Sequence, residues 1–161
     1  MRSIIWLSAV LLTVSALLAE TKVYKGTSTY SGDCIVTFRD GRVYKGNSTY
    51  SGDCIANWKD GKIYKGTSTY SGDCVATFQD GRLYKKNSTY SGDCIANLKD
   101  GKLYKGTSTY SGDCVATFRD GRAYKGNSTY SGDCIMTFSG DRLPAAVRAW
   151  LIWHFYLGWF F

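Results

Sequence analysis

Hydrophobic and polar positions along this chain follow a 20-residue pattern that recurs six times. Each copy opens with an aliphatic residue and a Tyr-Lys pair, and the copies begin at Val23, Val43, Ile63, Leu83, Leu103 and Ala123. Self-similarity at a fixed period decides the fold class, because near-identical units fold alike and stack on one another. Thr and Asn also alternate between successive copies at two positions, which indicates growth by duplication of a 40-residue pair.

Each copy contains two runs of β-branched and aromatic residues that predict β-strands. In the first copy these are residues 23–30 and 34–38, separated by a Ser-Gly-Asp segment and followed by Asp-Gly. Asp-Gly between such runs is a strong signal for a hairpin. The sequence therefore predicts an all-β fold, an antiparallel meander of six 20-residue hairpin repeats.

The turn lengths determine which side chains share a face of this sheet. If residues 39–41 form a three-residue turn with glycine in the left-handed position, Phe38 opposes Arg42 and covers Gly26. The Tyr, Cys and Phe positions then share one face, and the Lys and Thr positions share the other. Two-residue turns would exchange these partners and place Lys beside Phe, so the three-residue register is the one predicted.

One short motif resembles a known repeat family. Residues 60–66, Asp-Gly-Lys-Ile-Tyr-Lys-Gly, resemble the Asp-Gly-x-x-Tyr-x-Gly core of MORN repeats over about a third of each unit. The resemblance implies a single-layer antiparallel array of hairpins. MORN proteins are commonly linked to membranes or scaffolding, but the resemblance is used here for the fold and not for a function.

The cysteines distinguish this meander from its alternative, a β-solenoid with one coil per repeat. All six occupy the same slot of the repeat. Cysteines on alternate strands lie roughly 9 to 10 Å apart, beyond the roughly 7 Å that a disulfide spans, whereas stacked coils would bring them to about 4.8 Å. The meander therefore predicts free thiols acting as small buried groups. With no Cys-x-x-Cys pair and His154 as the single histidine, no metal site or cofactor is predicted.

The two ends of the chain differ from the repeats, which gives three segments. Residues 1–19 have the plan of a signal peptide, and their apolar run of about 16 residues is short for a membrane span. Residues 20–142 hold the repeats, and residues 143–161 form an aromatic C-terminal segment that Pro144 opens as a helix. We therefore expect an exported protein, located in the periplasm, on the cell surface or outside the cell.

The aromatic segment 143–161 has three competing uses. It can form a lid on the apolar face of the sheet, an anchor at a membrane interface, or a tail that binds a partner. The anchor uses large aromatic side chains, which favour the interface between water and lipid. The candidate membrane-interface residues are Trp150, Trp153, Trp159 and Phe161.

The charge pattern and the lack of acid-base pairs favour binding over catalysis. A net charge of +7 favours an anionic polysaccharide, envelope or lipid surface. Nucleic acid is not expected, because the basic residues recur singly instead of clustering. Near-identical units also favour self-association. No Ser-His-Asp set can be assembled, so no catalytic residue is predicted and the protein is expected not to be an enzyme.

We therefore expect a non-enzymatic secreted or envelope-associated repeat protein that acts as a multivalent binding or structural surface module. The alternative is a surface-active protein, either an ice-binding one that uses the Thr-x-Thr pattern or one anchored to a membrane through its C-terminal segment. The candidate binding residues are Tyr24, Tyr44, Tyr64, Tyr84, Tyr104, Tyr124, Lys45, Lys65 and Lys105.

Overall fold

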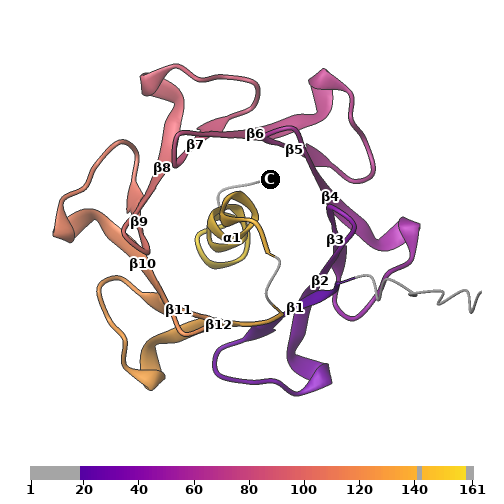
Figure 1. The fold of residues 1–161 in the computed structure, drawn as a ribbon, viewed down its shortest axis with the longest axis horizontal. Coiled ribbons are helices and arrows are strands. Elements are labelled where there is room, and N and C mark those ends of the chain that lie inside the picture. Colours follow the sequence, from indigo (N-terminus) through magenta and orange to yellow (C-terminus); the bar gives the residue numbers. More distant parts are fainter. Residues whose placement is uncertain (1–18, 141–142, 159–161) are drawn as a thin grey trace, which may run out of the picture.

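The repeats form one ring of twelve antiparallel strands. The computed structural model describes residues 19–140 and 143–158, so the predicted signal peptide lies almost wholly outside the described residues. Figure 1 shows the strands as a closed wall, with six loops projecting outward and a helix in the middle. The strands are β1 (Thr21–Lys25), β2 (Cys34–Arg39), β3 (Arg42–Lys45), β4 (Cys54–Lys59), β5 (Lys62–Lys65), β6 (Cys74–Gln79), β7 (Arg82–Lys85), β8 (Cys94–Lys99), β9 (Lys102–Lys105), β10 (Cys114–Arg119), β11 (Arg122–Lys125) and β12 (Cys134–Ser139).

The ring closes because the first strand pairs with the last. Val23 of β1 lies opposite Phe138 of β12, and every other pair joins strands that are neighbours in sequence. The predicted antiparallel hairpin repeats are confirmed, but they close into a barrel instead of remaining an open meander, and the solenoid alternative is wrong. Closure leaves no unpaired strand edge, which removes the usual site of sheet-to-sheet aggregation.

The hairpin turns are shorter than predicted. Asp40 and Gly41 have φ angles of 50° and 76°, and Arg39 lies directly opposite Arg42. Positive φ at both central residues identifies a two-residue type I′ turn, whose twist matches that of the flanking strands. The predicted three-residue turn is therefore wrong, and Phe38 opposes Val43 instead of Arg42.

The corrected register sorts the side chains into an inner and an outer face. Val36 and Phe38 share the inner face with Val43, and Thr37 and Tyr44 lie opposite each other on the outer face. Ile35 is the extra residue of a β-bulge, because Cys34 pairs with Tyr24 and Val36 pairs with Val23. The bulge recurs in every repeat and bends the wall beneath each loop.

The outward loops, which we call petals, lie between the short and the long strand of each repeat. In the first repeat the petal spans residues 26–33, and the other five follow at 20-residue intervals (Figure 1). Each petal ends in a single turn of 3-10 helix, at Ser31–Asp33, Ser51–Asp53, Ser71–Asp73, Ser91–Asp93, Ser111–Asp113 and Ser131–Asp133.

A C-terminal helix fills the lumen of the ring. Helix α1 (Ala145–Leu151) starts after Pro144, and a π-helical turn continues it over Ile152–Tyr156. Trp150 is only 1% exposed, because α1 lies inside the ring (Figure 1). The predicted C-terminal helix is confirmed, and it packs against the apolar inner face of the sheet.

Candidate binding surface

Each petal holds its shape through hydrogen bonds of its own. Ser28 Oγ donates to Asp33 Oδ2 at 2.6 Å and accepts from the backbone N–H of Tyr30 at 3.0 Å. The backbone N–H of Asp33 donates to the Tyr30 carbonyl at 2.9 Å. The Ser-to-Asp bond recurs in all six petals, at 2.6 or 2.7 Å. This network gives each petal the same rigid conformation without help from the core.

The most exposed large side chain of each petal is a tyrosine. Tyr30 is 72% exposed, although its ring is held against the backbone of Gly32. A Cβ atom at Gly32 would lie 2.6 Å from Tyr30 Cε1, so only glycine lets the ring settle there. The six equivalent side chains are 72 to 73% exposed and are Tyr30, Tyr50, Tyr70, Tyr90, Tyr110 and Tyr130.

Asparagine side chains join neighbouring petals. Asn87 Nδ2 donates to the Ser71 carbonyl of the preceding petal at 2.7 Å, and Asn87 Oδ1 accepts from Lys62 Nζ at 3.1 Å. Asn57 Nδ2 donates to the Ser68 carbonyl of the following petal at 3.2 Å. Because the two kinds of bridge alternate around the ring, the 40-residue period seen in the sequence has a structural cause.

The junction between the last and the first petal uses a different contact. Thr137 occupies the position of Asn57, and its Oγ1 donates to the Gly26 carbonyl at 2.7 Å. The backbone N–H of Gly26 donates in turn to the Ile135 carbonyl at 2.9 Å. A side-chain hydrogen bond therefore joins each petal either to the preceding petal or to the neighbouring strand of the wall.

The structure places the predicted tyrosines away from this surface. Tyr24, Tyr44, Tyr84 and Tyr124 are buried at 6 to 8% exposure, and Tyr64 and Tyr104 are half-buried. They lie on the outer face of the wall beneath the petals, opposite the Thr or Asn side chain of the adjacent strand. The prediction assumed accessible rings, and this assumption needs correction because the petals cover them. The accessible tyrosine is the second one of each repeat, which its place in a turn rich in Ser and Gly could have indicated.

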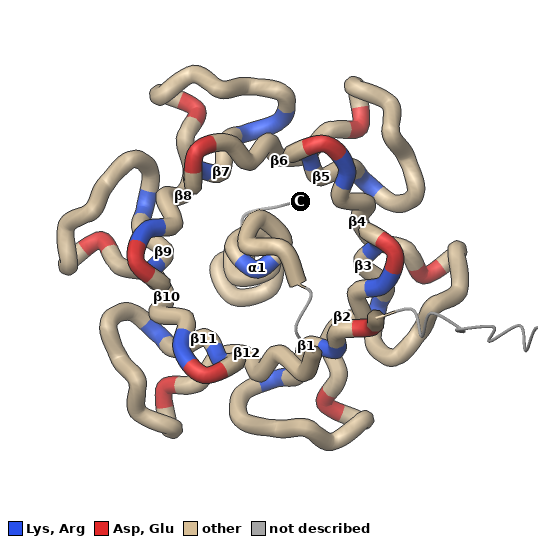
Figure 2. Tube along the Cα trace, viewed as in Figure 1, with Lys and Arg blue, Asp and Glu red and all other residues tan. Residues whose placement is uncertain are grey.

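The predicted lysines are exposed but lie apart from the petal tips. Lys45, Lys65 and Lys105 end their short strands opposite Val36, Ala56 and Ala96 of the inner face. Lys65 and His154 line a cavity of about 420 Å³ where the helical segment leaves the lumen. The lysines are therefore at the bases of the petals, where they add positive charge to the surface around the ring (Figure 2).

Two of the four predicted membrane-interface residues are inside the protein. Trp150 and Trp153 are 1% and 2% exposed, because both pack against the inner wall. Both side chains therefore belong to the core of this structure, while Trp159 and Phe161 lie outside the described residues. No helix within residues 19–140 and 143–158 is long and apolar enough to cross a membrane.

The cysteines lie beneath the petals as free thiols. Cys54 Sγ donates to the carbonyls of Ala56 and Gly66, both at 3.4 Å. Burial raises the pKa of the Cys34, Cys54 and Cys94 thiols above its ordinary value, which favours their neutral form. Within the described part of the chain, no three His, Cys, Asp or Glu side chains gather as metal ligands.

Comparison with known proteins yields one family match. A model of the family described as "6-fold beta flower protein" matches residues 8–100 and 84–150. No curated protein and no solved structure matches the chain. The match agrees with six short hairpin units closed into a ring, and it does not confirm the resemblance to MORN repeats.

Proposed function

Because this chain belongs to the family of 6-fold beta flower proteins, we propose that its six petals act together as one multivalent binding surface. The protein binds a repeating polymer or a surface outside the cell and catalyses no reaction. Each petal supplies one weak contact, and the closed ring fixes all six contacts relative to one another. Simultaneous engagement of weak sites then gives an affinity far above that of any single petal.

The observation that carries this proposal is the set of six exposed tyrosines. A large aromatic side chain that is 72% exposed has no role in the core. The Ser28–Asp33 bond and the bond from the Tyr30 N–H to Ser28 Oγ hold the backbone beneath each ring, so the six rings project from petals of the same shape. Tyrosine has only two side-chain torsions, so it gives contact area at a low entropic cost.

The chemistry of the surface favours an acidic polysaccharide as the partner. The flat face of a tyrosine ring stacks on the apolar face of a sugar, and its hydroxyl can bond the sugar hydroxyls. The net charge of +7 and the exposed lysines at the petal bases attract carboxylate or sulfate groups. A long polymer of this kind can reach several petals at once.

Binding to immobilised alginate, with neutral dextran for comparison, tests the proposal. Variants in which one, three or six of the petal tyrosines are replaced by alanine, starting from Tyr30→Ala, should bind with a steeply decreasing apparent affinity. The fold should survive, because substitution of an exposed side chain changes stability by only about 0.5 kcal/mol. Alginate should bind more tightly than dextran, and the difference should shrink as salt is added.

A matched control uses another exposed residue of the same petals. Thr29 is exposed and adjacent to Tyr30, so Thr29→Ala at one, three or six petals changes the surface without removing a ring. These variants should bind like the wild-type protein. Equal losses in the threonine and tyrosine series, or no dependence on the number of tyrosines, would contradict the proposal.

A further inference from the structure

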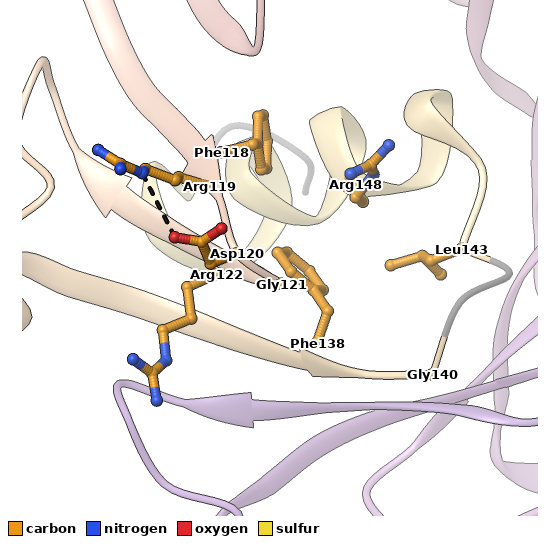
Figure 3. A pocket seen from close by; sticks show the side chains of 9 residues that line it. All are labelled: Phe118, Arg119, Asp120, Gly121, Arg122, Phe138, Gly140, Leu143 and Arg148. Carbon is orange, nitrogen blue, oxygen red and sulfur yellow. Dashed lines mark ion pairs between the residues drawn. The ribbon is translucent and has the colours of Figure 1, made fainter.

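A cavity lies where the last two repeats meet the C-terminal helix. It has a volume of about 280 Å³ and lies between the β10–β11 hairpin and the start of the luminal helix. Phe118, Phe138 and Leu143 form its apolar wall, and Arg148 of α1 points toward Phe118 (Figure 3). The cavity breaks the six-fold symmetry, because the chain enters the lumen at this place alone.

Arg148 is an unusual residue for a helix inside an apolar lumen. It is the only charged residue of α1, and Figure 2 shows it as the one basic segment in the middle of the ring. Its Nε atom is shut off from solvent and has no hydrogen-bond partner, and within the described residues no carboxylate forms an ion pair with it. Its guanidinium carbon lies 5.7 Å from the centre of the Phe118 ring. An enclosed cationic donor without an acceptor is costly.

Among the described residues that line the cavity, no other charged group compensates Arg148. Asp120 faces Arg119 at the rim, with an oxygen-to-nitrogen distance of 3.3 Å, and its side chain is 82% exposed. Arg119 and Arg122 line the cavity but point away from Arg148 (Figure 3). The Asp120 carboxylate would repel an anion placed beside it, so an anion must lie deeper, at Arg148. The described part of the cavity therefore combines the positive charge of Arg148 with an aromatic wall.

We propose that this cavity binds a small organic monocarboxylate. The carboxylate accepts a hydrogen bond from the Nε atom of Arg148, which has no partner in the protein, and forms a charge-assisted pair with the half-buried guanidinium. The apolar body of the ligand lies against Phe118, Phe138 and Leu143. A cavity of about 280 Å³ is at the lower limit for small-molecule sites, so the ligand has about ten non-hydrogen atoms.

Titration of the intact protein with phenylacetate and octanoate tests the site, with calorimetry and ligand-detected NMR as the readouts. At least one of the two acids should bind in the millimolar range or more tightly. Phenylacetamide has the same shape as phenylacetate without the charge, and it should bind about tenfold or more weakly. Arg148→Met keeps the length of the side chain and removes the charge, and it should weaken binding of the acid by about tenfold to a hundredfold.

The repeats provide a matched control for the apolar wall. Phe118→Leu should weaken binding, whereas Phe78→Leu changes the same slot of another repeat, away from the cavity, and should leave binding unchanged. If Arg148 only supported the fold, Arg148→Met would lower the thermal midpoint; we expect the midpoint without ligand to stay equal or rise. Equal binding of acid and amide, wild-type affinity in Arg148→Met, or no binding of either acid at millimolar concentration would overturn the proposal.

Discussion

Lys86 should destabilise the ring through its backbone conformation. It occupies the petal position that is glycine in the other five repeats, and all six residues adopt left-handed backbone angles, with φ of 50° for Lys86 and 54° to 58° for the glycines. The backbone cannot relax, because the Lys86 N–H donates to the Val75 carbonyl at 3.1 Å and the Lys86 carbonyl accepts from Thr77 Oγ1 at 2.6 Å. Lys86→Gly therefore removes strain without removing either bond.

The expected gain follows from two opposing contributions to the free energy of unfolding. A residue with a side chain in the left-handed region is about 1 to 2 kcal/mol less stable than in the right-handed region. Glycine loses about 0.5 to 1 kcal/mol more conformational entropy on folding. The net gain is about 0.5 to 1 kcal/mol, which raises the thermal midpoint of a chain of this size by about 1 to 4 °C.

Urea unfolding of the wild type, Lys86→Gly and the reverse substitution Gly46→Lys measures this difference. Gly46→Lys places a side chain at the equivalent position of another petal and should cost a similar amount. Lys86 has an exposed side chain, so loss of packing does not enter the comparison. Equal stability of all three proteins, or a less stable Lys86→Gly, would refute the strain argument.

Two further results are expected from the core and the thiols. Trp150→Ala should lower the free energy of unfolding, measured by urea denaturation, by about 3 to 5 kcal/mol. The reason is that the Trp150 ring is 1% exposed in the centre of the lumen. A loss below about 1 kcal/mol would show that the helix contributes little to stability. Because burial raises the pKa of Cys54 and of its two counterparts, Cys34 and Cys94, the neutral thiols contribute stability that is present at neutral pH and is lost as the pH rises through the raised pKa. A variant with these three cysteines changed to alanine should lose less stability than the wild type as the pH is raised from neutral into the alkaline range, and equal losses would contradict the assignment.

Local chemistry made the hairpins predictable, but not their register. Asp40-Gly41 identified where the turn lies but not how many residues it has. The length of the turn decides whether Phe38 lies opposite Val43 or Arg42, and with either length the side chains still alternate between the two faces of the sheet. A longer turn would keep Lys45 away from the apolar face, but the fold does not require this. Lys45 ends its strand at the mouth of the lumen and is exposed, so its charge never enters the core.

Closure of the ring and the burial of Tyr24 depended on geometry that a repeat pattern does not contain. The number of strands that closes a barrel follows from the tilt and stagger of the strands. Each repeat contacts only its two neighbours, so the sequence of one repeat does not give this number. The Ser and Gly residues around Tyr30 could have indicated that this second tyrosine is exposed. That Tyr24 is buried depends on the petal that begins at Gly26, which folds back over the wall and covers it.

The inner wall differs among the repeats in a way that the petals do not. The Tyr-Ser-Gly-Asp-Cys segment is the same in all six repeats, whereas the slot of Phe38 also holds Trp58 and Leu98, and the slot of Val36 also holds Ala56 and Met136. A single helix in a lumen with six identical sides would have six equivalent rotational orientations, and none would be preferred. Unequal side chains remove this degeneracy and select one orientation, so the inner wall fits a single placement of the C-terminal helix, while the petal tips present the same segment to the solvent six times.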